Sequence, residues 1–300
     1  MKQFTKKTIA LILCLVLALS LGLTALAAAN GDLNGDNKIT TDDARKILRA
    51  SIGLDTLSAA AKKAADMDLD GAVTTADARL ALRVAIGLEL SDGKLYENQY
   101  DVLRSGFFYA DFNITDVAES QNILLAVSKQ STYMRMEFTD EELLTEFGVE
   151  SIKINMLFRD DRAWLLDPEN RQYAEFPFEA MGMSAEELAS MSEAKDMFKD
   201  YPPLSAATSV GSGSFGGVSC TVYTFTDSTG SMKVYLNGPK LLGIEETDAS
   251  GKTLVTDTFR SVALTIPAAC TAIPSGYTEG DAMEMLLVMF FGDLLSDLGD

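Results

Sequence analysis

Two acidic stretches of the 300-residue sequence have the composition and spacing of sites for a hard cation. The first begins at Asp32 and the second at Asp66, and each has oxygen-bearing side chains at its first, third and fifth positions. A carbonyl at the seventh position, a threonine at the ninth and an aspartate at the twelfth extend each set towards the six to eight oxygens that calcium takes. The expected ligands are Asp32, Asn34, Asp36, Lys38, Thr40 and Asp43 in the first loop, and Asp66, Asp68, Asp70, Ala72, Thr74 and Asp77 in the second. The sequence therefore predicts two bound calcium ions.

The chain after each loop repeats as well. An amphipathic helical pattern follows each loop and ends at a glycine, Gly53 or Gly87, which is a common C-terminal stop. Asn37 and Gly71 stand at the sixth loop position, where the chain must turn through a left-handed conformation. One acidic loop alone is consistent with an ordinary solvated turn. Two loops in the same register, each followed by a near-copy of one helix, favour a duplicated metal-binding unit.

A loop and one following helix, duplicated and with no helix before either loop, resembles the type I dockerin family. The resemblance implies a non-catalytic adaptor that binds calcium and docks into a cohesin domain of a scaffoldin, as in cellulosome-type complexes for polysaccharide catabolism. It also implies cohesin contacts at Thr41, Asp42, Leu48 and Arg49 in the first repeat, and at Thr75, Ala76, Leu82 and Arg83 in the second. Because Asp42 differs from its equivalent Ala76, docking in one or in two orientations stays open.

The N-terminus predicts export. Three lysines within the first seven residues precede an apolar run over residues 9–29, which ends in three alanines. This pattern is typical of a secretory signal peptide, here residues 1–29. An uncleaved membrane anchor is the alternative, since the run is long enough to span a bilayer, but the alanine-rich end favours cleavage. We therefore expect a secreted protein, extracellular or attached to the cell surface through a cohesin.

The composition of the chain further restricts the classes of function that the protein can have. The net charge of −19 argues against nucleic acid as a partner. The absence of histidine excludes Ser–His and Cys–His nucleophile pairs and His-ligated metal sites. Beyond the predicted signal peptide two cysteines are present, Cys220 and Cys270, and an even number in a secreted chain predicts a disulfide between them.

The predicted fold has two parts, a small all-α dockerin at residues 30–90 and an α+β domain at residues 91–300. In the second, apolar and polar residues alternate between tight turns from about residue 108 to residue 264, which predicts a long antiparallel sheet. Residues 211–217 are rich in glycine and serine and predict a flexible loop. The predicted helices cover residues 95–105, 139–148, 184–198 and 281–298. The last of these is apolar nearly all round, which predicts a buried helix.

This order of elements resembles the outer-membrane lipoprotein carrier-like superfamily. The similar stretches are residues 159–174, where a turn leads into an aromatic strand and an Asp-Pro turn, and residues 231–277. The resemblance implies an antiparallel sheet that curves into a half-barrel, is lidded by helices and binds an apolar small molecule, a lipid or a lipidated partner. The last helix then closes the cavity, either permanently or as a lid that a ligand displaces.

Two alternatives to a component that binds an apolar ligand are open, a polysaccharide-degrading enzyme and a carbohydrate-binding module. Carboxylate pairs can hydrolyse glycosides without histidine, and Asp160, Asp161 and Asp167 near Trp164 are the candidates. Asp160 and Asp161 stand in a predicted hairpin turn, however, where solvated aspartates are common, and a single tryptophan is few for stacking on sugars. The sequence therefore favours a non-catalytic protein.

Overall fold

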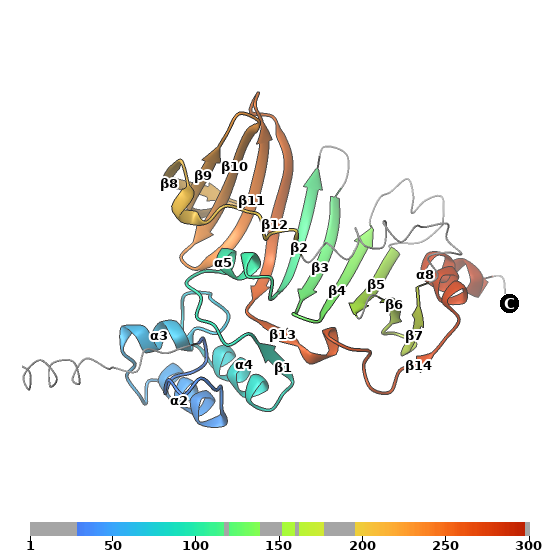
Figure 1. Ribbon diagram of the computed structural model, residues 1–300, viewed down its shortest axis with the longest axis horizontal. Coiled ribbons are helices and arrows are strands. Elements are labelled where there is room, and N and C mark those ends of the chain that lie inside the picture. Colours follow the sequence, from blue (N-terminus) through green and yellow to red (C-terminus); the bar gives the residue numbers. More distant parts are fainter. Residues whose placement is uncertain (1–28, 117–119, 139–151, 160–161, 177–195, 298–300) are drawn as a thin grey trace, which may run out of the picture.

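The computed structural model describes residues 29–116, 120–138, 152–159, 162–176 and 196–297 (Figure 1). The predicted signal peptide, the helix predicted at 139–148 and most of the helix predicted at 184–198 lie outside these residues, as do Asp160 and Asp161. No helix within the described ranges is both long enough and apolar enough to cross a membrane.

The N-terminal part contains three helices, α2 (Thr41–Ser51), α3 (Ala59–Ala65) and α4 (Thr75–Ala85). A reciprocal capping box, formed by Thr40 with Asp43 and by Thr74 with Asp77, begins each of the two duplicated helices. Helices α2 and α4 contact each other, and both contribute buried residues to the core, namely Ala44, Ile47, Ala78 and Ala81. The duplication in the sequence is therefore a duplication in the fold.

The second part is built on one 12-stranded sheet, in the order β14-β7-β6-β5-β4-β3-β2-β12-β11-β10-β9-β8. Neighbouring strands are antiparallel except for the β14–β7 pair, and the two meanders β2–β7 and β8–β12 join where β12 pairs with β2. The bounds are β2 (Phe108–Asp116), β3 (Ser120–Val127), β4 (Ser131–Phe138), β5 (Ile152–Arg159), β6 (Arg162–Asp167), β7 (Gln172–Glu175), β8 (Ser209–Phe215), β9 (Val218–Thr226), β10 (Gly230–Asn237), β11 (Lys240–Asp248), β12 (Thr253–Ala263) and β14 (Thr278–Glu279). The chain is thus an α+β protein dominated by one long sheet.

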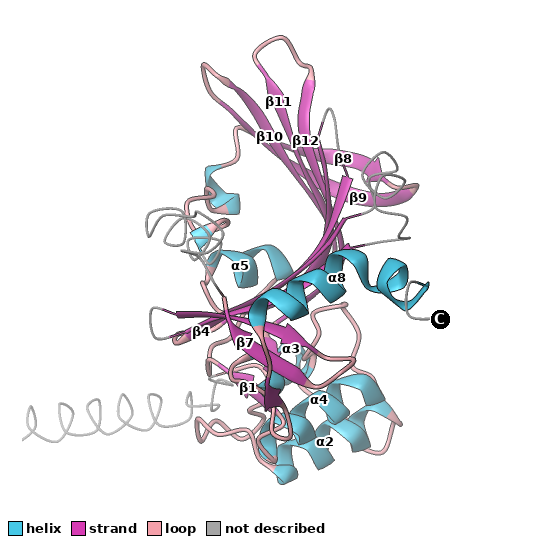
Figure 2. Ribbon diagram, turned by 90° about the vertical axis from the view of Figure 1, so that its right-hand side faces the viewer, coloured by secondary structure: helices cyan, strands magenta, loops and turns pink. Residues whose placement is uncertain are grey.

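The sheet is strongly curved, and helix α5 (Gln99–Arg104) lies on its hollow side (Figure 2). We call the face that carries the main apolar cluster the inner face. Its fully buried members include Phe108, Phe112, Leu125, Met156 and Leu165. Because side chains alternate along a strand, these residues fall on one face of the sheet. Helix α5 and the C-terminal helix α8 (Ala282–Asp297) contribute residues to the same cluster.

A short second sheet joins the two parts of the chain. Strand β1 (Glu89–Ser91) pairs antiparallel with β13 (Thr265–Pro267), which precedes the 3-10 helix η3 (Ala268–Cys270). The predicted boundary between the two parts, at residues 90 and 91, therefore lies within a strand. Helix α5 also begins later than its predicted start at residue 95, because the Asn98 side chain accepts a hydrogen bond from the Asp101 amide and caps the helix there.

The prediction of a flexible loop at residues 211–217 was wrong, since Ser209–Phe215 form β8, an edge strand paired with β9. Glycine disfavours strands, but the hydrogen bonds of the ladder to β9 outweigh that local preference here. Gly213 also lies too close to its neighbour for a larger residue, since a Cβ at this position would stand 2.7 Å from Val222 Cγ2. The turn comes only at Gly216 and Gly217, which both have positive φ.

The predicted disulfide was also wrong, because Cys220 and Cys270 are free thiols. Cys220 lies in β9, whereas Cys270 packs against Phe107, Ala126 and Ile266, next to β2 and β3. Three strands lie between β2 and β9, so four spacings of about 4.8 Å, or about 19 Å along the sheet, separate the strand that holds Cys220 from the strand beside Cys270. A disulfide requires Cα atoms within about 7 Å.

We therefore expect two titratable thiols in the denatured protein that lacks residues 1–29. The measurement is a thiol count with a chromogenic disulfide reagent, before and after treatment with a reductant. Equal counts of two agree with the structure, and a Cys220→Ser variant should give one thiol. A count of zero that rises to two after reduction would contradict the structure.

Candidate functional site

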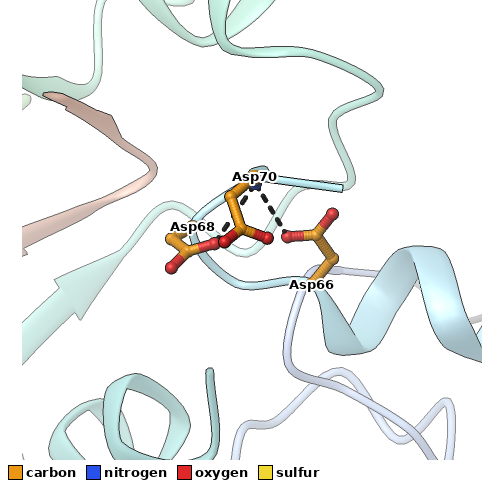
Figure 3. Close-up of side chains that lie close together, drawn as sticks. All are labelled: Asp66, Asp68 and Asp70. Carbon is orange, nitrogen blue, oxygen red and sulfur yellow. Dashed lines mark hydrogen bonds between the residues drawn. The ribbon is translucent and has the colours of Figure 1, made fainter. Parts of the chain in front are cut away.

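The second acidic loop brings its side-chain oxygens together. Asp66, Asp68 and Asp70 each place a carboxylate oxygen within 4.8 Å of the others (Figure 3). Oxygens that share a calcium ion lie 2.3–2.6 Å from it, so this mutual spacing fits a common ion. The donor set is hard and anionic, which suits calcium. The first loop has the same plan, with Asn34 in place of one carboxylate.

Hydrogen bonds from the backbone to these side chains fold each loop around its first aspartate. In the first loop Asp32 accepts from the amides of Gly35 at 2.6 Å and Asn37 at 2.9 Å. In the second, Asp66 accepts from the amides of Asp70 at 3.1 Å and Gly71 at 3.0 Å. The two loops thus have equivalent folds, as their common register predicts.

Left-handed residues stand at two positions of each loop. Asn37 (φ 63°) and Gly71 (φ 95°) occupy the sixth position and confirm the predicted turn. Gly35 (φ 75°) and Leu69 (φ 54°) are left-handed at the fourth position, which the sequence did not indicate. Leucine rarely adopts this conformation, and the burial of the Leu69 side chain offsets the cost.

Acidic crowding makes the second loop electrostatically unfavourable without a cation. Burial, together with the charges of Asp77 and Asp68, raises the pKa of Asp66 to about 6. Burial and the charges of Asp77 and Asp70 raise the pKa of Asp68 to about 6 as well. Both shifts mean that the ionised loop is disfavoured, and a bound divalent cation would remove that penalty.

The remaining predicted ligands close the loops. Asp43 and Asp77, at the twelfth position, are fully buried and accept hydrogen bonds from the amides of Thr40 and Thr74. Lys38 and Ala72, at the seventh position, donate their amides to Asp36 and Asp70 at 2.9 and 2.8 Å. The loop ends and the helix starts are therefore built from the same residues.

The predicted cohesin contacts lie at the surface of α2 and α4. Thr41, Asp42, Leu48 and Arg49 are exposed, as are Thr75 and Leu82, whereas Ala76 and Arg83 are half-buried. Leu48 and Leu82 have the same exposed fraction, 42%. Arg49 pairs with half-buried Asp55 at 2.8 Å, but Arg83 pairs with buried Glu89 of β1 at 2.9 Å. The two faces are therefore similar in shape and differ in how their arginines are held.

Exposed apolar residues extend both faces beyond the predicted contacts. They are Ile52 and Leu54 after α2, and Ile86 and Leu88 after α4. Ile52 and Ile86 are each 57% exposed, which is unusual for isoleucine in a folded domain. Both pairs belong to a repeated Ile-Gly-Leu tripeptide. This repeat in the sequence could have predicted that the exposed apolar faces continue beyond the helices.

The second calcium loop is joined to the sheet domain. The Gln99 side chain of α5 donates to the Asp68 carbonyl at 2.7 Å and accepts from the Leu241 amide at 3.0 Å. The Asn30 side chain, fully buried, accepts from the Tyr96 amide at 2.8 Å. These contacts cross from one part of the chain to the other and place the second loop, but not the helix faces, against the sheet domain.

Of the proposed catalytic carboxylates only Asp167 is described, and it has a structural role. Its Oδ1 accepts from the amides of Glu169 at 2.9 Å and Asn170 at 3.0 Å, and its Oδ2 accepts from the Asn170 side chain at 2.8 Å. These bonds form the Asp-Pro turn between β6 and β7.

A different carboxyl group, on the inner face of the sheet, has a perturbed environment. Burial, with a contribution from the Glu246 carboxylate, raises the pKa of Asp257 in β12 to about 7. Burial and the same glutamate raise the pKa of Tyr201, whose hydroxyl donates to Glu246 Oε1 at 3.0 Å. This group was not predictable from the sequence, because an aspartate within an alternating strand gives no signal of being buried.

The Asp257→Asn variant should be the more stable protein at high pH. The pKa of Asp257 is higher in the folded state, about 7, than the ordinary 3.8, so folding loses stability as pH rises from about 4 through 7. Asparagine does not titrate, so the variant avoids this loss. Its free energy of unfolding should exceed that of the original protein by up to about 4 kcal/mol at pH 8.5, and by much less at pH 4.5. Urea unfolding followed by the fluorescence of Trp164, the single tryptophan, reports on the sheet domain. An equal effect at both pH values would contradict this assignment.

The geometry of the N-terminal part defines a duplicated calcium-loop domain, and comparison with known families agrees. Residues 30–82 match the family described as dockerin type I domain. This segment of the chain is therefore a type I dockerin domain, as its sequence predicts. No curated protein matches the sequence.

Comparison with solved structures finds distant likenesses to the sheet domain. An uncharacterised conserved protein from Thermus thermophilus is 12% identical, with a TM-score of 0.31, over 61% of this chain and 96% of that one. The Pseudomonas aeruginosa MucA/MucB complex gives 13% identity and a TM-score of 0.31, over 59% of this chain and only 58% of that one. A putative outer membrane lipoprotein-sorting protein domain from Vibrio parahaemolyticus gives 11% and 0.21, over 63% and 97%. Since these TM-scores are below 0.5, nothing about function follows from them.

Proposed function

We propose that the protein is a secreted, non-catalytic component of a cellulosome-type complex, docked onto a cohesin of a scaffoldin through a dockerin that holds two calcium ions. The matching exposure of Leu48 and Leu82, at equivalent positions of two folded repeats, is the observation that carries this proposal. Apolar residues on a helix face, ringed by charged ones, are typical of a protein-binding surface.

Calorimetric titration with a panel of type I cohesin domains in millimolar calcium tests the docking. Leu48→Asp combined with Leu82→Asp should reduce the affinity at least 100-fold, because it puts charges at the centre of both faces. Leu254→Asp is the matched control, since Leu254 is also 42% exposed but lies in β12. The absence of binding to every cohesin in the panel would contradict the proposal, as would equal effects of the three substitutions.

The proposed role of the second domain is to bind an apolar ligand or a lipidated partner in a half-barrel. The inner face supports this proposal, because four methionines gather there. Met134 and Met156 stand opposite each other on β4 and β5, and Met136 and Met232 pack against the same cluster. Flexible thioether side chains adapt to ligands of varied shape. Native mass spectrometry of the secreted protein, before and after organic extraction, tests whether a lipid co-purifies.

A further inference from the structure

An acidic group stands among the apolar side chains of the inner face. Asp257 of β12 lies directly opposite Ile244 of β11 and Ile114 of β2. Its side chain is buried, with 5% of the residue exposed, and its Oδ1 has no hydrogen-bond partner among the described residues. A buried polar atom without a partner lowers stability, so this atom is positioned for a donor that the described chain does not supply.

Two further oxygen-bearing groups, Glu246 and Tyr201, lie close enough to Asp257 to interact with it electrostatically. Glu246 is two residues beyond Ile244 on the same strand, so it shares the inner face with Asp257. The Tyr201 hydroxyl donates to Glu246, and the Tyr201 carbonyl accepts from the Arg104 guanidinium at 2.7 Å. Within the described part of the chain, neither Glu246 nor Asp257 forms an ion pair with a lysine or arginine. Among the described residues, the result is a group of three oxygens with excess negative charge and no paired cation.

The chemistry of this group favours an organic cation over a metal ion. Calcium takes six to eight oxygens, and magnesium retains several waters, whereas the neighbours of Asp257 across the sheet are isoleucines. A primary ammonium group has three N–H donors and no acceptor, which matches three oxygen acceptors. Hydrogen bonds between ionised partners are about twice as strong as neutral ones.

The surroundings also provide for an apolar chain attached to that cation. Val234 and Ile244 continue the row of Asp257 across β10 and β11, and Phe259 follows on β12. All three are buried in the main cluster. Met232, Glu246 and Val255 form the next row of paired residues across β10, β11 and β12. These three residues are only half-buried. The half-buried row is therefore the point of approach for a ligand, whose apolar part would replace side chains that now cover the buried row.

We infer that Glu246, Asp257 and Tyr201 form a binding site for the primary ammonium head of an amphipathic molecule whose apolar chain lies on the inner face of the sheet. The inference rests on the proposed apolar-ligand function of this domain and adds the class of ligand. Glu246 and Asp257 attract the head by charge, and Tyr201 orients the glutamate.

Calorimetric titrations of the calcium-saturated full-length protein with decylamine, decanol and decanoate test this inference. Decylamine should bind at least about tenfold more tightly than decanol or decanoate, because only its head makes charge-assisted hydrogen bonds. Asp257→Asn and Glu246→Gln should each remove that preference while leaving the affinity for decanol unchanged. Glu245→Gln is the matched control, since Glu245 neighbours Glu246 on the opposite face, where it pairs with Lys233 at 3.1 Å.

The outcomes separate the two proposals. If decanol and decanoate bind as tightly as decylamine, or if Asp257→Asn leaves the amine preference intact, the ammonium site is refuted and the apolar-ligand function survives. If none of the three compounds binds, both are refuted. Circular dichroism of each variant confirms that it is folded before titration. Cohesin binding, which involves the helix faces of the dockerin, stays unaffected in every case.

Discussion

Removal of calcium from the intact protein should abolish cohesin binding and unfold residues 30–88. Asp66, Asp68 and Asp70 crowd their carboxylates within 4.8 Å, and without a cation their repulsion opposes the loop. At a calcium concentration of about 100 times Kd, each bound ion stabilises the folded state by about 2.7 kcal/mol, so two ions contribute about 5 kcal/mol. A domain of this size has a stability of similar magnitude. Circular dichroism and calorimetry with cohesin, in calcium and in excess chelator, measure the effect.

Substitution of the ligands should reproduce the effect of chelation. Asp36→Ala combined with Asp70→Ala removes one carboxylate from each loop and should eliminate cohesin binding at physiological calcium. The matched control is Asp227→Ala with Asp248→Ala, two aspartates that accept backbone hydrogen bonds in turns of the sheet domain. Unchanged cohesin affinity and an unchanged helical signal after chelation would refute a calcium-dependent dockerin.

Removal of calcium should also affect the sheet domain, because Gln99 links the second loop to that domain. Its side chain spans from the Asp68 carbonyl to the Leu241 amide. If the loop loses its structure, the Gln99 side chain loses one of its two anchors. Hydrogen exchange at the Leu241 amide should therefore accelerate in chelator, whereas exchange at amides in the centre of β5 should not change.

The dockerin was predictable because its information is local. The spacing of ligands within twelve residues, the capping residues Thr40 and Thr74, and the repeat at a fixed interval all act within one short segment. The strands were predictable for the same reason, since alternation is a property of neighbouring residues. The pairing of β12 with β2, which joins the two meanders, depends on residues about 145 positions apart, and the alternation pattern carries no information about it.

The errors share one physical cause, which is that tertiary contacts outweigh local preference. The glycines of β8 signalled a loop, yet pairing with β9 makes a strand of them. The even number of cysteines predicted a disulfide, but Cys220 lies in β9 and Cys270 lies next to β2 and β3, in a distant part of the sheet. Asp257 and Tyr201 come together only because the chain folds the segment after residue 195 onto the inner face. No spacing rule connects residues 56 positions apart.

The C-terminal helix also departs from its prediction, because it is only partly buried. Met285 and Leu286 are 3% and 6% exposed and belong to the main cluster. Met283 and Leu287, on the same helix, are 45% and 49% exposed. The helix contacts β5, β6 and β7, so it covers the inner face at that end of the sheet. A uniformly apolar sequence did not reveal which side of the helix packs.

Met285→Ala combined with Leu286→Ala should destabilise the sheet domain by about 4 kcal/mol or more, since each buried Met or Leu truncated to Ala costs about 2–5 kcal/mol. Met283→Ala with Leu287→Ala is a matched control that deletes the same two residue types from the exposed side, and it should cost less than about 1 kcal/mol. Urea unfolding followed by Trp164 fluorescence measures both. A large loss for the first pair alone identifies the helix as a permanent cover of the inner face. If the first pair keeps full stability and gains affinity for a hydrophobic dye, the helix is a displaceable lid. If the two pairs cost the same and neither changes dye binding, burial of Met285 and Leu286 adds nothing to the stability of the sheet domain, and the helix is neither a permanent cover nor a lid.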